Sequence, residues 1–374
     1  MKILYVFRSL AQWGGIERVL VDKMNYLVAM YNYDVYMLTA DQGDHSVPYP
    51  LEDGVHFEDL CIRFHQQYLY RGLKRLIVAR RLSRLFKQRL SARLQEIKPD
   101  IIVCTTANYI DINILAELKG TVPLIVESHS IYQKTLGQKG LRHRYADYMY
   151  HRGMSKAQMI IALTEDDAKE WSRIIGHVCV IPNMVHLNEG EVSSLDHKRV
   201  IWVGRFDYQK CPMEMIEVWK IVYPKFSSWH LDIYGEGEQR EKLERMASTI
   251  GMNIHIHQPA YNIFDSYRNS SIMVSTSLYE PFGLVIPEAM SCGLPVVSYD
   301  VPYGPASIIS DGVNGFLINK RNINEFANRV CQLIEDEELR FRIGQAAIKS
   351  AQCYRADLIM SKWKELFEEL RSKE

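Results

Sequence analysis

Residues 271–300, SIMVSTSLYEPFGLVIPEAMSCGLPVVSYD, hold the pattern that decides the fold. The runs SIMVSTS and PVVSYD are apolar and rich in β-branched residues, so both are expected to be buried strands. Between them, Pro281, Gly283 and Pro287 exclude one continuous helix. We expect a loop at YEPFGLV and a helix that begins near Pro287, because proline suits the first helical turn. A buried strand, a helix and a second buried strand form a parallel β-α-β unit.

The same alternation of apolar strands and helices runs along the chain on both sides of a polar stretch at residues 186–198, HLNEGEVSSLDHK. Two such series predict an α/β protein with two Rossmann-like, doubly wound domains. A length of 374 residues also fits about two domains. Ligands bind outside the carboxyl ends of strands in such sheets, so we expect the site in a cleft where the two domains face each other. The final segment, ADLIMSKWKELFEEL, predicts an amphipathic helix packed on one domain.

Composition places the chain among ordinary globular proteins, with 47% hydrophobic and 24% charged residues and 45 basic residues balancing 45 acidic ones. Five consecutive apolar residues precede Arg8, fewer than the roughly 7–15 of a secretory signal. No apolar run approaches the ~18 residues of a membrane span. Seven cysteines without a C-x-x-C pair indicate reduced thiols. We therefore expect a cytoplasmic protein.

Net neutrality hides one strongly basic segment between Arg63 and Lys98, which holds eleven Lys or Arg residues and one acid, Glu96. Apolar residues within it keep mostly helical spacing, which predicts a helix at 71–97 whose apolar stripe packs on the core. The excess charge also favours contact with an anionic membrane or a lipid-linked acceptor. Nucleic acid is less favoured, because the charge is confined to this segment and no recognised nucleic-acid motif accompanies it. The candidate surface residues are Arg71, Lys74, Arg75, Arg80, Arg81, Arg84 and Lys87.

Glu280 and Glu288 in the opening stretch are expected to differ in role, because proline and glycine separate them. Glu280 falls in the loop at the ligand end of the sheet, and Glu288 falls in the first helical turn. An acid in a first turn often only complements the helix dipole. Beside a bound sugar, however, a carboxylate accepts hydrogen bonds from paired hydroxyls. The amides around residues 282–284 and the helix start could cradle a phosphate.

Three further groups follow apolar strands. In GRFDYQK, Arg205 and Lys210 could converge on a diphosphate, although basic residues in loops are commonly just solvated. Gly14 and Gly15 follow the first strand and open a helix, so backbone amides could approach an anion, or the pair could form only a turn. His129 in VESHSIY stands at a strand end, where a structural role and a ligand-binding role are both open.

Together EPFGLVIPE, GRFDYQK, WGGIER and the strand-end histidine resemble the family 4 retaining glycosyltransferases of the GT-B fold. The two glutamates with seven residues between them, followed by AMSCGLPVV and DGVNGFLI, are the most specific part. Order and spacing match over essentially the whole chain. The stretch PYGPASII resembles the branch that builds bacterial capsular, exopolysaccharide and lipid-linked glycans.

The resemblance implies an acceptor-binding domain at 1–182, a nucleotide-sugar-binding domain at 183–355, and a helix at 356–374 that crosses back to the first domain. It implies transfer of a hexose or HexNAc from a UDP-sugar to a glycan acceptor, with retention and without a metal or other cofactor. The implied location is the cytoplasmic face of the cell membrane, with peripheral attachment. Alternatives are a non-catalytic nucleotide-sugar-binding or scaffold protein of the same fold, or a related phosphorylase or epimerase.

Residue roles follow from the same resemblance. Arg205 and Lys210 would neutralise the leaving diphosphate, Glu288 would hold the ribose, and Glu280 would face the transferred sugar. The catalytic set also includes His129, near O6 of the sugar, and the donor set includes Gly15 at the diphosphate. The amides of Phe282, Gly283 and Leu284 would lie near sugar and phosphate.

The chain departs from the family pattern at three positions, Cys211, Met184 and Pro259, where glycine is usual. These departures affect the expected loop shapes and the pocket for the base. The adjacent Asp166 and Asp167 in TEDD are expected to belong to a helix cap with Thr164, and not to a metal site. His255 and His257 share a strand face without acids or cysteines nearby in sequence, so we expect them to be structural.

Overall fold

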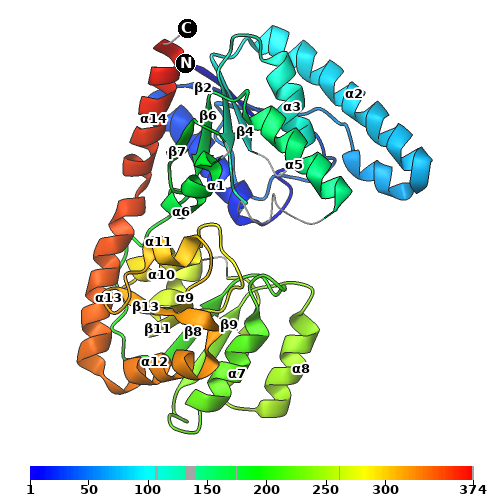
Figure 1. Cartoon of the computed structure of the whole chain (residues 1–374). Coiled ribbons are helices and arrows are strands. Elements are labelled where there is room, and N and C mark those ends of the chain that lie inside the picture. The colour runs from blue at the N-terminus through cyan, green and yellow to red at the C-terminus, as the bar shows by residue number, and fades with distance from the viewer. Residues whose placement is uncertain (106–107, 131–139, 174, 261, 373–374) are drawn as a thin grey trace. The chain divides into compact units, whose positions relative to one another are not determined.

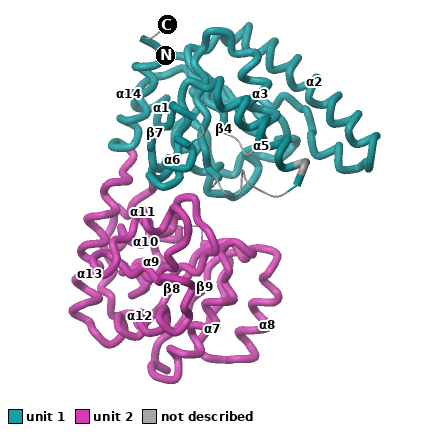
Figure 2. The backbone as a smooth tube through the Cα atoms, viewed as in Figure 1, with its two compact units in different colours: residues 1–184, 357–374 teal, residues 185–356 magenta. Residues whose placement is uncertain are grey.

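A parallel β-sheet forms the centre of each half of the chain in the computed structural model, which describes residues 1–105, 108–130, 140–173, 175–260 and 262–372. The chain divides into two compact units, shown in separate colours in Figure 2. Unit 1 comprises Met1–Met184 and Asp357–Glu374, and unit 2 comprises Val185–Ala356. The boundary expected from sequence, between residues 182 and 183, lies two residues before the observed one.

Unit 1 has a seven-stranded sheet in the order β3-β2-β1-β4-β5-β6-β7, with all strands parallel. Its central strands are buried on both faces, as their continuous apolar runs predict. The strand order reverses between β1 and β4, which marks the topological switch point of a doubly wound sheet. The strands are β1 (Lys2–Phe7), β2 (Asp34–Thr39), β3 (Val55–Asp59), β4 (Ile101–Thr105), β5 (Leu124–Glu127), β6 (Met159–Ala162) and β7 (Val178–Val180).

Helices cover this sheet on both faces (Figure 1). The last helix, α14, packs on unit 1, where Met360, Trp363 and Phe367 are buried. The sequence predicted this helix and its buried apolar face. The helices of unit 1 are α1 (Gly15–Tyr31), the 3₁₀ helix η1 (Phe64–Leu69), α2 (Gly72–Ile97), α3 (Tyr109–Leu118), α5 (Leu141–Met154), α6 (Glu165–Ser172) and α14 (Ala356–Ser372).

Unit 2 repeats the architecture with six parallel strands in the order β10-β9-β8-β11-β12-β13. Its switch point lies between β8 and β11, the strands that precede the motifs GRFDYQK and YEPFGLV. The topology therefore brings both motifs to neighbouring strand ends. The strands are β8 (Arg199–Val203), β9 (His230–Tyr234), β10 (Ile254–His257), β11 (Ile272–Ser275), β12 (Val296–Tyr299) and β13 (Gly315–Ile318).

The helices of unit 2 enclose a core with large buried side chains, among them Trp202, Phe206 and Trp219. The helices are α7 (Pro212–Val222), α8 (Arg240–Ile250), α9 (Ile263–Arg268), α10 (Val285–Ser291), α11 (Gly304–Ile308), η2 (Asn319–Arg321), α12 (Ile323–Glu335), α13 (Glu337–Ala351) and η3 (Gln352–Tyr354).

Helix α2 forms where the sequence placed it, but its apolar stripe is covered only in part. Leu82, Phe86, Leu90 and Ile97 are buried, as expected. The expectation is wrong for the first turns, where Leu73, Leu76 and Ile77 are exposed at 74%, 60% and 59%. The reason is geometric, because η1 and the start of α2 project from the sheet of their unit (Figure 1).

Candidate functional site

Lys210 and Glu280 form an ion pair at the carboxyl ends of β8 and β11. The two side chains are almost buried, and the pair involves Nζ of Lys210 and Oε2 of Glu280. The Ser277 hydroxyl donates to the same carboxylate oxygen at 3.2 Å. Charge-assisted hydrogen bonds of this kind are among the stronger ones in proteins, so the pair fixes both loops at this edge of the sheet.

The loop that carries Lys210 closes on Asp207. The backbone N–H of Lys210 donates to Asp207 Oδ1 at 2.9 Å, and that of Cys211 donates to the Asp207 carbonyl at 3.1 Å. Cys211 then caps α7 with φ 52 and ψ 53, a left-handed conformation. The substitution of cysteine for the usual glycine therefore leaves the loop in the conformation that glycine favours.

Arg205 pairs with residues other than Lys210 and Glu280 and is open to solvent, with 59% of its side chain exposed. Its guanidinium pairs with Asp207 Oδ2 at 3.0 Å and donates to Gln209 Oε1 at 3.2 Å. Gln209 in turn donates to the Tyr279 carbonyl at 3.2 Å, which links the two motifs a second time. The structure thus places Arg205 and Lys210 on one short loop, with different degrees of exposure.

Gly235 and Gly237, which were not predicted from the sequence, allow the loop after β8 to lie close to the loop after β9. The N–H of Gly204 donates to the Tyr234 carbonyl at 3.1 Å, and that of Phe206 donates to the Glu236 carbonyl at 2.8 Å. A Cβ at Gly235 would lie 1.9 Å from the Gly204 oxygen, and one at Gly237 would lie 2.6 Å from the Phe206 oxygen. The signal in the sequence was YGEG, a pair of glycines directly after a strand.

Helix α10 begins at Val285, two residues before the start expected at Pro287. Proline is tolerated there because residues of the first turn need no intrahelical N–H donor. Glu288 lies in the first turn, as predicted, and is buried.

In the loop before the helix, Gly283 has φ +93, a backbone conformation that favours glycine. Phe282 is buried, and its ring lies 5.2 Å from that of Tyr354, so the ring packs inside the unit and does not face solvent. Leu284 is the residue that precedes the helix.

The segment that follows β12 contacts and supports the loop that carries Glu280. The N–H of Gly304 donates to the Glu280 carbonyl at 2.8 Å, and Tyr303 pairs with Glu280 as an isolated β-bridge. A Cβ at Gly304 would lie 2.4 Å from the Phe282 oxygen, so the approach requires glycine. Tyr303 adopts φ 80 and ψ −74, an unfavourable conformation for a residue with a side chain.

Arg321, another residue that sequence reasoning missed, supports the same loop. Its guanidinium donates to the Ser277 carbonyl at 2.7 Å and to the Thr276 carbonyl at 3.2 Å. It also pairs with Glu214 of α7 and lies 4.4 Å from the centre of the Tyr299 ring. In the sequence only its position, shortly after the strand GFLI, hinted at a role.

In unit 1, α1 begins at Gly15, directly after an extended Gly14. A Cβ at Gly14 would lie 2.1 Å from a carboxylate oxygen of Glu17, so the Glu17 side chain packs closely against the Gly14 backbone. His129 lies just beyond β5, with 7% of its side chain exposed. Its Nε2 is 3.1 Å from Glu127 Oε2.

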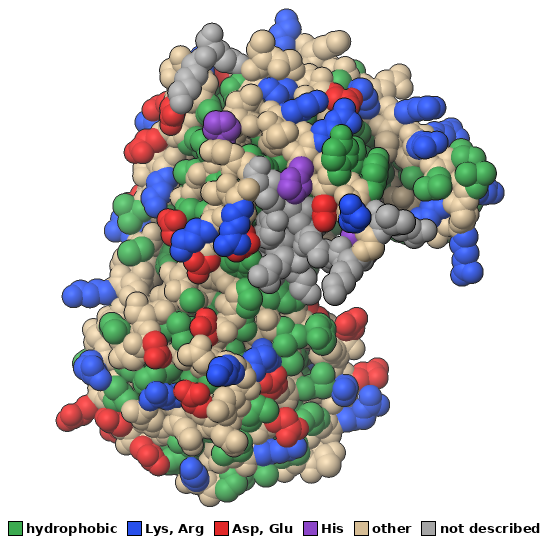
Figure 3. Space-filling model, in the orientation of Figure 1, with side chains coloured by type: hydrophobic (Ala, Val, Ile, Leu, Met, Phe, Trp, Pro, Cys, Tyr) green, Lys and Arg blue, Asp and Glu red, His purple; other side chains and the backbone are tan. Residues whose placement is uncertain are grey.

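The basic residues of α2 surround exposed apolar and aromatic side chains. Lys74 lies 4.5 Å from the centre of the Tyr70 ring, and Arg75 lies at the same distance from the Tyr68 ring. Lys87 pairs with Glu117 of α3 at 2.6 Å. Figure 3 shows hydrophobic and basic side chains gathered at the end of the α2 region.

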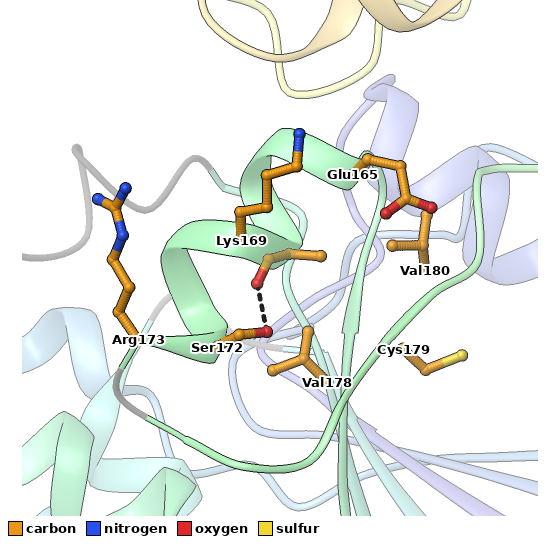
Figure 4. Close-up of a pocket in the computed structure, with 8 residues that line it drawn as sticks. Glu165, Lys169, Ser172, Arg173, Val178, Cys179 and Val180 are labelled. Atoms are coloured by element: carbon orange, nitrogen blue, oxygen red, sulfur yellow. Dashed lines mark hydrogen bonds between the residues drawn. The ribbon is translucent and has the colours of Figure 1, made fainter.

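A shallow pocket opens between α6 and β7 of unit 1 (Figure 4). Lys169 and Arg173 project from α6 beside it, and the Ser172 hydroxyl donates to the Ala168 carbonyl at 2.8 Å. Glu165 and Cys179 also line it. Lys169 pairs with Asp166 and Arg173 with Glu170, so these cations belong to ion pairs along the helix.

The TEDD segment forms the expected helix cap. Thr164 Oγ1 accepts from the Asp167 N–H at 3.3 Å, and Asp167 Oδ2 accepts from Trp171 Nε1 at 3.2 Å. An acid that is distant in sequence lies beside the histidine pair. His257 Nε2 is 2.8 Å from the buried Asp232 of β9, because β9 and β10 run side by side. Asp232 also accepts from Arg199 at 2.9 Å, which fits a structural ion-pair group.

Comparisons with known proteins place both units in described families. Residues 13–189 match the model for Glycosyltransferase Family 4, and residues 188–350 match that for Glycosyl transferases group 1. The chain is 24% identical over 378 residues to the amylovoran biosynthesis glycosyltransferase AmsD of Erwinia amylovora, covering 98% of this chain and 99% of that protein.

A second relative is matched only in part. The poly(ribitol-phosphate) alpha-N-acetylglucosaminyltransferase of Staphylococcus aureus (strain COL) is 29% identical over 217 residues, covering 57% of this chain and 43% of that protein. Among solved structures, Anabaena HepE in complex with UDP superposes with a TM-score of 0.75 at 20% identity, covering 99% of this chain and all of HepE. Among the described residues, no helix is both long and apolar enough to cross a membrane.

Proposed function

The chain belongs to the family 4 glycosyltransferases and has their GT-B fold, and on that premise we propose that it transfers a hexose or HexNAc from a UDP-sugar to a polysaccharide acceptor. The observation that carries the proposal is the Lys210–Glu280 pair at the switch point of unit 2. A cation and a carboxylate at that point offer the two kinds of group that a nucleotide sugar needs, one for phosphate and one for hydroxyls.

Arg205 and Lys210 are the proposed partners of the diphosphate. The Lys210 ammonium has three donors and gives one to Glu280, so two remain for phosphate oxygens. Arg205 is exposed, and its guanidinium contacts only side chains of its own loop, Asp207 and Gln209, among the described residues. The planar guanidinium can therefore turn toward a ligand. Two cations on one loop supply the charge that stabilises a leaving diphosphate.

Glu280 is the proposed partner of the transferred sugar. Its carboxylate accepts from Lys210 and Ser277 through one oxygen, Oε2, which leaves acceptor capacity for a sugar hydroxyl. Hydrogen bonds from Gly304 and Arg321 hold the loop in place before a ligand binds, which lowers the entropic cost of ordering the loop on binding.

Glu288 is the proposed partner of the ribose hydroxyls, and the amides of residues 282–284 are the proposed contacts of sugar and phosphate. Support comes from the left-handed Gly283 and the helix start at Val285, since amides near a helix N-terminus favour an anion. In unit 1 we assign His129 to the sugar, near O6, and Gly15 to the diphosphate, as in the family that the chain resembles.

The proposed reaction keeps the configuration at the sugar's anomeric carbon. The bond from that carbon to the phosphate oxygen breaks, and a bond to the acceptor oxygen forms on the same face. The acceptor's proton passes to the departing phosphate oxygen, so no protein base is needed. Because Arg205 and Lys210 supply positive charge to the leaving UDP, we propose that turnover requires no metal, which activity in the presence of EDTA would test.

We further propose that η1 and the first turns of α2 dock on an anionic membrane, at its cytoplasmic face, where a lipid-linked acceptor would be found. Tyr68, Leu69, Leu73, Leu76 and Ile77 are all exposed. They are interspersed with Arg71, Lys74, Arg75, Arg80, Arg81 and Arg84. Apolar side chains flanked by cations suit the boundary between acyl chains and anionic head groups. A second copy of this chain would instead bring like charges together.

The decisive experiment is UDP release with a panel of UDP-sugars and glycan acceptors, preceded by a thermal-unfolding screen for donors that stabilise the protein. Release of UDP that depends on an acceptor supports the proposal. Donor binding without turnover under all conditions would identify a scaffold protein, and activity with orthophosphate or with no acceptor would identify a phosphorylase or epimerase.

A further inference from the structure

A buried group of charged and polar side chains lies behind His129 in unit 1. Lys23 of α1 and Glu127 of β5 are each only 2% exposed, and they form an ion pair through Glu127 Oε1. The other carboxylate oxygen, Oε2, accepts from the Thr105 hydroxyl at 2.9 Å and lies 3.1 Å from His129 Nε2. One buried carboxylate therefore contacts a lysine, a threonine and the histidine.

Glu127 is ionised within this group. Burial alone would raise the pKa of its carboxyl, but Lys23 and His129 outweigh burial and hold that pKa at about 2. Burial lowers the pKa of Lys23, and Glu127 opposes that shift. The ammonium also lies 4.3 Å from the centre of the Trp363 ring and 5.7 Å from that of Tyr5. Both aromatic faces favour the charged form of the lysine.

An ionised carboxylate has no hydrogen to donate. The 3.1 Å contact can therefore be a hydrogen bond only if His129 Nε2 carries the proton. In the neutral ring Nδ1 is then an acceptor. Among the residues that the structure describes, none forms a hydrogen bond with Nδ1 of His129. That nitrogen is the one left for a ligand.

We propose that Glu127 is a positioning residue that fixes His129 as its Nε2–H tautomer and so presents Nδ1 as a hydrogen-bond acceptor for a hydroxyl of the transferred sugar. The assignment rests on the proposed function, in which His129 meets that sugar. Lys23 has a part in the same device, because it holds one carboxylate oxygen and leaves the other for the histidine. It follows that the chain selects a donor sugar with a hydroxyl at that position over the corresponding deoxy sugar.

The substitution Glu127→Gln tests the device, because an amide has one acceptor oxygen and one donor nitrogen. Lys23 can only donate, so the amide oxygen is expected to face Lys23. The NH₂ group then faces His129, whose Nε2 must accept, and the proton moves to Nδ1. The double substitution Lys23→Met with Glu127→Gln removes the ammonium donor that the amide oxygen would otherwise face. The amide oxygen can then turn to His129 and Thr105, which restores the Nε2–H tautomer.

The tautomer can be read without substrate from the ring ¹⁵N chemical shifts of histidine-labelled protein. His129 is assigned by the signals that vanish in His129→Gln. We expect the Nε2–H pattern in the native chain, the Nδ1–H pattern in Glu127→Gln, and the Nε2–H pattern again in the double variant. Thr105→Val is the matched control, because it removes another hydrogen bond to the same carboxylate and should leave the tautomer unchanged. An Nδ1–H pattern in the native chain, or the pattern of a ring protonated at both nitrogens, would overturn the proposal even if no variant folded.

Turnover separates this proposal from the proposed function. We expect kcat for UDP release to fall at least tenfold in Glu127→Gln and to recover in the double variant, with unfolding temperatures recorded alongside. Recovery is the informative readout, since a merely structural role would make the double variant worse. If the native chain turns over and Glu127→Gln has the same kcat, the positioning role is rejected and the proposed function is not. Absence of native turnover with every donor would reject the proposed function, while the tautomer result would still stand.

Discussion

Lys210 and Glu280 lie 70 residues apart in the sequence and form one ion pair at the ends of adjacent strands. The pair joins the loop after β8 to the loop after β11. Each partner also keeps hydrogen-bonding capacity beyond the pair. In the proposed reaction the pair holds the leaving diphosphate and the moving sugar in a fixed relation.

Glu280→Gln should reduce kcat by about 100-fold or more, because the amide replaces a charged contact with the transferred sugar, and loss of one preorganised electrostatic contact has an effect of that size in other enzymes. UDP alone should bind with nearly native affinity, since the proposed contact is with the sugar. UDP release and calorimetric titration with UDP measure the two effects. Turnover close to native in Glu280→Gln would remove the residue from the proposed mechanism.

Arg205→Ala should weaken UDP binding by about 10- to 100-fold, which corresponds to the ~1.5–3 kcal/mol of a hydrogen bond to a charged group. Turnover should fall as well, because the same cation stabilises the leaving group. Arg245→Ala on α8 is the matched control, since that exposed arginine lies outside the candidate site. Equal UDP affinity in both variants would reject the contact between Arg205 and the diphosphate.

Cys211→Gly should raise the free energy of unfolding of unit 2 by about 1 kcal/mol, because a left-handed conformation costs ~1–2 kcal/mol for a residue with a Cβ. Greater freedom of glycine in the unfolded chain offsets part of that gain. Cys211→Ala is the control, since it removes the 3.6 Å contact of Sγ with Glu214 without relieving the backbone. Denaturant unfolding measures both, and equal stability of the two variants would contradict the backbone explanation.

The central strands of both sheets could be predicted from the sequence, because buried parallel strands are short, continuous apolar runs rich in β-branched residues. The edge strands β3 and β13 were not predicted, and β3 (VHFED) is not such a run. The loop and helix at residues 276–291 were predictable for a similar reason, since proline and glycine constrain the backbone locally. Only the start of α10 was misplaced, by two residues. Local residue chemistry therefore gave the elements on which the candidate site residues lie.

Contacts between distant residues could not be predicted in the same way. Lys23 lies within a helix where a lysine is usually exposed, and nothing local shows that Glu127 lies opposite it. Apolar spacing likewise identified one face of α2, but spacing does not show whether a neighbour covers that face. The roles of Glu280, Arg205 and His129 stay predictions, since the folded chain shows where they lie and not what they bind.

Acid should destabilise unit 1 through Glu127. Its carboxyl has a pKa of about 2 in the folded protein against an ordinary value of 4.5, so its ionised form contributes stability above pH 4.5. That contribution is lost as the pH falls from 4.5 toward 2, and a shift of this size corresponds to about 3 kcal/mol. Glu127→Gln should therefore show a flatter dependence of unfolding free energy on pH in that window. Parallel curves for the native and variant chains would show that the buried carboxylate does not carry the effect.

Charge on α2 should control association with anionic vesicles. Substitution of Arg80, Arg81 and Arg84 by alanine should weaken partitioning onto phosphatidylserine-containing vesicles by on the order of 100-fold, at ~1 kcal/mol per residue. The residual binding should depend less on salt than that of the native chain. Arg342→Ala, at an exposed position of α13, is the control for a general loss of charge. Native binding that does not change with salt would contradict the electrostatic part of the proposal.

The exposed apolar side chains at the start of α2 should contribute separately. Leu73→Ser, Leu76→Ser and Ile77→Ser should each weaken vesicle binding by about tenfold, because burying such a side chain is worth ~1.5 kcal/mol or more. Unlike the arginine variants, these should lose affinity equally at low and high salt. They should leave the free energy of unfolding nearly unchanged, since their side chains are already exposed to solvent in the folded chain. A clear loss of stability with unchanged vesicle binding would mean that these residues pack on the protein and not on a membrane.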